Sequence, residues 1–190
     1  MSGQNKEFKF NVIAGRLKGR IIRAPDLGIT RPPLSRLRRS IFDYLNPILP
    51  GARYLDLFSG TGSYMFEAIS RGTVSALGVE REPRLAAAIN RQAAQLQIAD
   101  QLQCLSEDVF TAIPRLHRSG REFDIIMIAP PQYQGLIDRT LACLVEHPLA
   151  RTGATILCQH DTSEACPSPA AYPLVESRKY GNTTYSIMRR

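Results

Sequence analysis

The stretch Tyr54-Leu-Asp-Leu-Phe-Ser-Gly-Thr-Gly62 decides the fold of this 190-residue chain. Its first part is largely apolar, as in a buried strand, and its second part is a turn of small residues. A helical pattern follows, with Met65, Phe66 and Ile69 on one face and Gly72 as a stop signal. A strand, a glycine turn and a helix in this order point free backbone N–H groups at a ligand. The alternative is an ordinary tight turn between a strand and a helix.

Strand and helix patterns alternate through the rest of the chain, and the last stretch alternates as two strands around a Gly181-Asn182 turn. Alternation of this kind predicts an α/β fold with a mostly parallel sheet and helices on both faces. The final hairpin adds an antiparallel edge. The expected strands are 54–58, 74–79, 103–105, 123–128, 155–159 and two within 172–190, and the clearest later helices begin near 82 and run over 135–147.

The chain begins with a different kind of pattern. Residues 8–24 alternate apolar and polar side chains around a Gly15–Gly19 turn, which predicts a β-hairpin. Residues 34–45 have apolar side chains at helical spacing, and we expect Arg36, Arg38 and Arg39 to form a cationic stripe on the opposite face.

The positive charge is concentrated in this first part of the chain. The formal net charge is +7, with +8 in residues 1–53 and −1 in residues 54–190. A basic segment joined to a nearly neutral body indicates a polyanion-binding module attached to a separate core. A basic terminus that serves only solubility is the alternative.

Several classes of protein are excluded by composition. The sequence has no apolar run of the roughly 20 residues needed to span a membrane. The first residues lack the apolar core of a signal peptide, so we expect a cytoplasmic protein. The four cysteines, at 104, 143, 158 and 166, have no metal-ligand spacing. We expect them to be reduced packing residues, and we expect no metal site.

The ends of the predicted strands carry the candidate ligand-binding residues. In open α/β sheets, ligands bind beyond the carboxyl ends of the strands. Glu80 ends the second strand, where a carboxylate can accept both hydroxyls of a ribose, and Asp108 follows the third, where it could accept from an adenine amino group. Each acid alone fits a solvated loop residue, but together they favour a ligand that contains adenosine.

The glycine turn decides which adenosine ligand fits. A dinucleotide requires a third glycine near residue 65, for close helix packing under the pyrophosphate, and Met65 stands there. This argues against a nicotinamide-dependent oxidoreductase. A cofactor with adenosine and no phosphates fits better, and S-adenosylmethionine is the obvious candidate.

The motifs together resemble a known family. The glycine turn, Glu80, Asp108 and the Pro130-Pro131 step are similar to those of class I S-adenosylmethionine-dependent methyltransferases. The basic front resembles the bacterial 16S rRNA guanine-N2 methyltransferase family, and the resemblance extends from Phe10 to Arg189. The stretches that carry it are Val12-Ile-Ala-Gly-Arg-Leu-Lys-Gly-Arg20, Thr30-Arg-Pro32, Ser35-Arg-Leu-Arg38 and Lys179-Tyr-Gly181.

The resemblance implies a Rossmann-like, seven-stranded, mixed but mostly parallel sheet of order 3-2-1-4-5-7-6, with helices on both faces. It also implies a basic N-terminal hairpin and helix in residues 1–50, which bind RNA, and a methyltransferase domain in residues 51–190. The implied cofactor-binding residues are Asp56, Phe58, Ser59, Gly60, Thr61, Gly62, Glu80, Asp108 and Val109. The implied phosphate contacts are Arg16, Lys18, Arg20, Arg31, Arg36 and Arg38, and Arg39 adds a further charge.

One motif departs from the family. After the fourth strand the family has an Asp or Asn, two prolines and an aromatic residue, and this chain has Ala129-Pro130-Pro131-Gln132-Tyr133 as its catalytic loop. An oriented oxygen here is worth about 3–4 kcal/mol of transition-state stabilisation. Three readings stay open: Gln132 supplies the oxygen while Tyr133 stacks on the base, the target atom differs, or the site is inactive.

The expected function is methylation of the N2 amine of a guanine in 16S ribosomal RNA, by a monomer acting in the cytoplasm. A non-catalytic RNA-binding or ribosome-assembly protein is the alternative, and so is a methyltransferase for another base or atom, because Ala129 lacks the oxygen.

Overall fold

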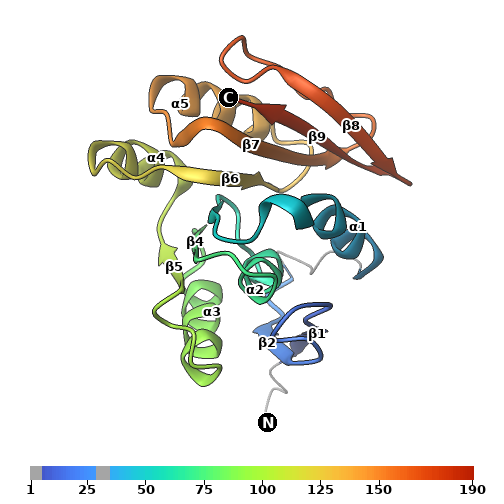
Figure 1. Ribbon diagram of the computed structural model, residues 1–190, viewed down its shortest axis with the longest axis vertical. Coiled ribbons are helices and arrows are strands. Elements are labelled where there is room, and N and C mark those ends of the chain that lie inside the picture. The colour runs from blue at the N-terminus through green and yellow to red at the C-terminus, as the bar shows by residue number, and fades with distance from the viewer. Residues whose placement is uncertain (1–5, 29–34) are drawn as a thin grey trace.

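The computed structural model describes residues 6–28 and 35–190 and contains two sheets (Figure 1). The small sheet is an antiparallel hairpin of β1 (Glu7–Asn11) and β2 (Ile21–Pro25). The large sheet contains β3 (Arg53–Asp56), β4 (Ser75–Glu80), β5 (Leu102–Ser106), β6 (Phe123–Ile128), β7 (Ala150–Asp161), β8 (Leu174–Tyr180) and β9 (Thr183–Arg189).

The helices are α1 (Ser35–Leu45), α2 (Ser63–Ser70), α3 (Pro83–Gln95), α4 (Val109–Arg118) and α5 (Leu136–Glu146), with a short 3-10 turn at Asn46–Ile48. The large sheet has the order β5-β4-β3-β6-β7-β9-β8. Strands β3 to β7 are parallel, whereas β9 runs antiparallel to β7 and β8. Counted along the chain this is 3-2-1-4-5-7-6, so the predicted topology and α/β class are confirmed.

Helices cover both faces of the large sheet. Apolar residues of α1, α2 and α3 pack on one face around Tyr54, and those of α4 and α5 pack on the other around Leu55 and Leu57 (Figure 1). Alternate residues of β3 therefore point into opposite layers, which explains why both Tyr54 and Leu55 are buried. The result is a three-layer domain whose parallel strands all end at one edge.

The N-terminal hairpin packs directly on the first layer. Phe10 and Ile22 lie in the same hydrophobic cluster as Phe42 of α1 and Phe66 of α2. The turn of the hairpin approaches α2 so closely that a Cβ at Gly15 would stand 1.9 Å from the carbonyl oxygen of Ser70. Glycine is required there on steric grounds. The division of the chain at residue 50 stays a prediction.

Two elements differ from the expected ones. The helix α4 was not predicted from the sequence, because it contains Pro114 and proline is unfavourable inside a helix. The strand β7 extends from Ala150 to Asp161, well beyond the predicted 155–159, and its pairing with β6 is irregular between Phe123 and Ile125. The extension of β7 was not predicted, because residues 151–153 at its start are not apolar.

Within residues 6–28 and 35–190, no helix is long and apolar enough to cross a membrane. The same residues contain no cluster of His, Cys, Asp and Glu side chains that could hold a metal ion. All four cysteines are free thiols.

Candidate active site

The glycine loop connects β3 to α2 and is bonded to the strands on either side. The amide of Leu57 donates to the carbonyl oxygen of Met127 in β6 at 3.0 Å. The amide of Ser59 donates to the carbonyl oxygen of Val79 in β4, also at 3.0 Å. These bonds continue the pairing of β3 past its end, so the loop lies between the carboxyl ends of β4 and β6.

Two glycines allow this close packing. Gly62 has φ of +76° and begins α2, and a Cβ there would stand 2.8 Å from Ile89. A Cβ at Gly78 of β4 would stand 2.5 Å from both the sulfur of Met65 and the hydroxyl of Ser59. Met65 therefore packs against a glycine of the neighbouring strand, and the close approach of helix and sheet does not need a glycine in the helix.

Glu80 binds the glycine loop with its carboxylate. Its Oε2 accepts the amide of Gly60 at 2.7 Å, and its Oε1 accepts the amide of Glu82 at 2.8 Å. Burial raises the pKa of Glu80, and these two hydrogen bonds oppose that rise. Each carboxylate oxygen retains a second lone pair that can accept a hydroxyl. The contact with Gly60 was not predicted, because nothing in the spacing of the two residues indicates it.

Asp56 is a buried carboxylate beside the same loop. Its Oδ1 accepts the amide of Phe58 at 3.4 Å, and its Oδ2 has no partner among the described residues. Burial raises the pKa of Asp56 to about 7, although the amide of Phe58 lowers it and Glu80 adds to the rise. A buried carboxylate oxygen without a donor is costly. It fits a ligand that brings an N–H group or a positive charge.

Asp108 follows β5 at the same edge of the sheet. Its side chain caps α4, with Oδ1 accepting the amide of Phe110 at 2.9 Å. Val109 is buried in the layer of α4 and α5. The cap accounts for the position of Asp108, and its contact with an adenine stays a prediction.

The loop Ala129–Tyr133 follows β6. Ala129 is half-buried and Pro130 is buried, whereas Pro131, Gln132 and Tyr133 are exposed. The side chain of Tyr133 is 67% exposed and its φ is +60°, an uncommon value for a residue with a large side chain. Its ring is therefore available to stack on a base.

Glu164, in the segment after β7, holds this loop in place. Its Oε1 accepts the amide of Tyr133 at 2.7 Å, and its Oε2 accepts the amide of Asp161 at 3.3 Å. Together with Pro130 and Gln132 it lines a cavity of about 40 Å³. Glu164 was not predicted as a site residue, because its hydrogen-bond partner, Tyr133, lies 31 residues earlier in the sequence. No local pattern connects the two residues.

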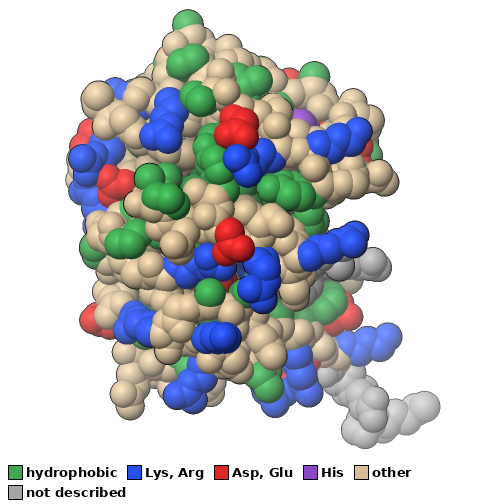
Figure 2. Space-filling model, turned by 45° about the vertical axis from the view of Figure 1, so that its right-hand side comes forward, with side chains coloured by type: hydrophobic (Ala, Val, Ile, Leu, Met, Phe, Trp, Pro, Cys, Tyr) green, Lys and Arg blue, Asp and Glu red, His purple; other side chains and the backbone are tan. Residues whose placement is uncertain are grey.

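The predicted phosphate contacts differ in where the structure places them. Arg16, Lys18 and Arg20 are exposed in and after the hairpin turn, and Arg36 and Arg39 are exposed on α1. Arg31 lies outside the described residues. Figure 2 shows Lys and Arg side chains with few acids among them over the lower part of the molecule, where Figure 1 places the hairpin and α3.

The expectation that Arg38 belongs to the exposed stripe is wrong. Its side chain is fully buried, lies 5.0 Å from the centre of the Phe10 ring, and donates to the carbonyl oxygen of Asn11. Arg38 precedes Ile41 and Phe42 by three and four residues, so it falls on the apolar face. The helical spacing itself contained this signal.

The fold and the site define the class. A sheet of order 3-2-1-4-5-7-6, with a glycine loop after its first strand and acids at the ends of the next two, is the architecture of class I S-adenosylmethionine-dependent methyltransferases. The chain belongs to the family described as "Conserved hypothetical protein 95", whose model matches residues 10–189.

The similar proteins include two with curated names. The chain is 28% identical over 181 residues to "Putative rRNA methyltransferase YlbH" of Bacillus subtilis, covering 94% of this chain and 98% of that protein. It is 26% identical over 183 residues to "Ribosomal RNA small subunit methyltransferase D" of Escherichia coli K12, covering 96% and 90%.

Solved structures agree on the fold. A putative methyltransferase from Escherichia coli, yhhF, aligns with a TM-score of 0.84 at 24% identity, over 96% of this chain and 98% of that one. An RNA methyltransferase from Salinibacter ruber, solved with S-adenosyl-L-homocysteine, aligns with a TM-score of 0.65 at 14% identity, over 84% and 93%.

Proposed function

We propose that this protein transfers a methyl group from S-adenosylmethionine to the N2 amine of a guanine in small-subunit ribosomal RNA. The observation that carries the proposal is the bonding of residues 57–59 to both β6 and β4. Neighbouring strands lie about 4.8 Å apart. The cofactor loop, the acid of β4 and the loop after β6 are thereby held side by side at one edge.

The residues around the glycine loop fit the cofactor. The unpartnered Oδ2 of Asp56 suits the ammonium group at the methionine end, and the loop 58–62 forms the wall beside it. The remaining lone pairs of Glu80 suit the ribose hydroxyls, and Asp108 with Val109 suit the adenine. When bound, the cofactor supplies a methyl group on a positively charged sulfur, so the donor is already activated.

The loop after β6 has to orient the guanine amine. The lone pair of N2 is delocalised into the ring, so an oxygen that accepts a hydrogen from N2 favours the pyramidal, reactive amine. Ala129 has no such atom, and the side-chain oxygen of Gln132, exposed three residues later, takes that role. The exposed ring of Tyr133 stacks on the base, which leaves its helix stack to enter the site.

Catalysis by this chain is then mainly positional. With the cofactor bound, the residues of the two loops would align the guanine amine with the methyl group for in-line transfer, and the amine would lose one proton to water. The protein contributes the alignment of the two reactants and the hydrogen-bond acceptor at the amine.

RNA is bound by the basic module of residues 1–50. The exposed cations that we expect to contact phosphates are Arg16, Lys18 and Arg20 of the hairpin with Arg36 and Arg39 of α1. Arg38 is not part of this set, because it is buried. Phosphate contacts of this kind position the RNA without reading its sequence.

The proposal is tested with small-subunit particles from cells that lack the enzyme. Purified protein and tritiated S-adenosylmethionine should label the ribosomal RNA, and Gln132→Ala should reduce the rate about 100-fold or more. Ala129→Asn in the Gln132→Ala background should restore part of it. Absence of label with the wild-type protein would contradict the proposal.

Ala129 favours a second candidate, a protein that binds RNA and does not methylate it. Calorimetry distinguishes the two candidates. If the protein binds S-adenosylmethionine tightly and methylates RNA, the second candidate is excluded. If it binds RNA but neither binds S-adenosylmethionine nor methylates RNA, the second candidate is supported.

A further inference from the structure

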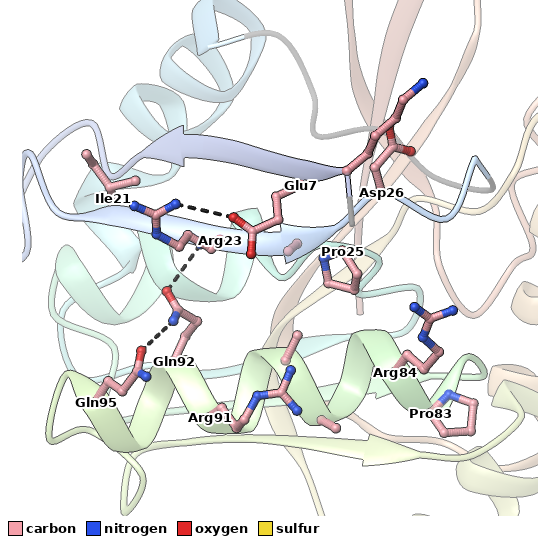
Figure 3. A pocket seen from close by; sticks show the side chains of 14 residues that line it. Glu7, Ile21, Arg23, Pro25, Asp26, Pro83, Arg84, Arg91, Gln92 and Gln95 are labelled. Atoms are coloured by element: carbon pink, nitrogen blue, oxygen red, sulfur yellow. Dashed lines mark hydrogen bonds and ion pairs between the residues drawn. The ribbon is translucent and has the colours of Figure 1, made fainter. Parts of the chain in front are cut away.

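An open groove of about 960 Å³ lies between the hairpin strand β2 and the helix α3 (Figure 3). This volume is at the upper end of the range of small-molecule pockets, about 300–1,000 Å³. One wall of the groove is the hairpin, which carries Arg23, and the opposite wall is α3, which carries Arg84 and Arg91 (Figure 3). The groove is separate from the glycine loop and from the loop after β6.

The groove has an excess of positive charge. Its two carboxylates are both engaged: Glu7 pairs with Arg23 at 3.3 Å, and Asp26 accepts the amide of Gly28 at 3.0 Å. Among the described residues, no carboxylate lies within ion-pair distance of Arg84 or Arg91. These two guanidinium groups are therefore available to a ligand, and they require an anionic one.

The spacing of the charges indicates a chain of anions. Arg84 and Arg91 are seven residues apart, which is about 10.5 Å along a helix axis. Side chains at this spacing can contact successive phosphates of a nucleic-acid strand. The lining has no aromatic side chain on which a base could stack. The groove is thus suited to a phosphate backbone and not to bases.

The two ends of the groove are consistent with the binding of a phosphate backbone. At one end, Gln92 accepts the amide of Arg23 at 3.2 Å and donates to Gln95, so the hairpin is fixed to the helix (Figure 3). The other end, at Pro83, is the start of α3, three residues after Glu80. The groove thus connects the hairpin with the edge of the sheet where the site lies.

We propose that this groove binds the phosphate backbone of one strand of the substrate RNA, through Arg84 and Arg91. The inference rests on the proposed function, because it takes ribosomal RNA as the substrate. It extends the RNA-contacting surface from the hairpin turn and α1 to a helix of the methyltransferase body.

A matched pair of variants at Ala87 tests the proposal. Ala87 is exposed, lines the groove, and lies three residues after Arg84 and four before Arg91. Glu and Lys have similar helix propensities, so Ala87→Glu and Ala87→Lys differ mainly in charge. We expect Ala87→Glu to raise the Kd for a 16S rRNA fragment about tenfold. Ala87→Lys should leave the Kd unchanged or lower it. Equal effects of the two variants would overturn the proposal.

A second comparison measures the number of phosphate contacts. We expect Arg84→Gln with Arg91→Gln to reduce the slope of log Kd against log salt by about 1.4, the value for two contacts with a single strand. Arg118→Gln with Arg121→Gln removes the same charge from exposed positions on and after α4 and should leave the slope unchanged. If both double variants behave alike, or if only particles that contain ribosomal proteins respond, the groove does not bind RNA. Because binding is measured without methyl transfer, RNA that binds in the groove but is not methylated contradicts the proposed function alone.

Discussion

The Nε atom of Arg38 lies 3.8 Å from Oε2 of Glu67, and both side chains are buried. Glu67 also accepts the amides of Ile13 at 2.9 Å and Ala14 at 3.2 Å, and the Nε of Arg71 at 2.8 Å. One carboxylate of α2 therefore holds the hairpin, α1 and its own helix together. Because α2 begins at the glycine loop, the N-terminal hairpin and α1 are joined to that loop through Glu67.

Glu67→Gln should destabilise the fold strongly. The substitution leaves the buried guanidinium of Arg38 without its anion, although Arg71 keeps its pair with Asp43 at 2.7 Å. Breaking a buried pair in this way costs about 3–5 kcal/mol. Urea unfolding measures the change. The exposed pair of Glu107 and Arg115 provides the control, since Glu107→Gln should cost less than about 1 kcal/mol. Similar values for the two variants would contradict the role of Glu67.

Asp56→Asn should change how stability depends on pH. Folding raises the pKa of Asp56 from 3.8 to about 7, so the folded state holds this proton more tightly than the unfolded state. The contribution to stability is complete below pH 4 and is lost as pH rises through 7. Without cofactor, the variant should match the wild type near pH 4 and exceed it by on the order of 4 kcal/mol at pH 8.

Urea unfolding between pH 4 and pH 8 checks this expectation. A difference between the two proteins that does not vary with pH would show that Asp56 is ionised in the folded state. Thermal unfolding adds a second result, because S-adenosylmethionine should raise the Tm of the wild type at pH 8 and have little effect on Asp56→Asn.

Glu80→Gln should weaken cofactor binding. The amide side chain still accepts one backbone N–H, but it loses the charge that strengthens the bonds to the ribose and to Gly60. Charge-assisted hydrogen bonds contribute about 1.5–3 kcal/mol, so we expect the Kd for S-adenosylmethionine to rise about 10- to 100-fold by calorimetry. Glu107→Gln, at the end of the next strand, should bind normally. Normal binding by Glu80→Gln would remove Glu80 from the cofactor site.

The topology of the sheet could be predicted from the sequence, because it depends on local patterns. The apolar run of β3, the small-residue turn and acids at strand ends are visible residue by residue. The position of Arg38 was also encoded in the helical spacing, but the usual exposure of arginine argued against it. Its partner, Glu67, lies 29 residues away, so the buried pair follows only from the tertiary fold.

The contacts of the catalytic loop could not be predicted for a similar reason. The position of Tyr133 depends on a backbone hydrogen bond to Glu164 and on a φ of +60°. The sequence near Tyr133 and near Glu164 indicates neither this hydrogen bond nor the positive φ. The groove between β2 and α3 likewise exists only because the hairpin packs on α3. The periodicity of the sequence does not indicate that packing.

Tyr133→Phe and Tyr133→Ala should have different effects on methylation. Tyr133 is 67% exposed, so its expected role is stacking of its ring on the base. Stacking on an aromatic ring is worth about 1–3 kcal/mol per base. We expect Tyr133→Ala to lower kcat/KM about 10- to 100-fold and Tyr133→Phe to retain it. Equal losses in steady-state assays would indicate a role for the hydroxyl instead.

Mass spectrometry of nucleosides tests the central claim most directly, because it reports the base and the atom together. Small-subunit particles from cells that lack the enzyme are incubated with the protein and S-adenosylmethionine, and their RNA is digested to nucleosides. We predict the appearance of N2-methylguanosine, and its loss with Gln132→Ala. A different methylated nucleoside, or none, would contradict the assignment of this site to the guanine amine.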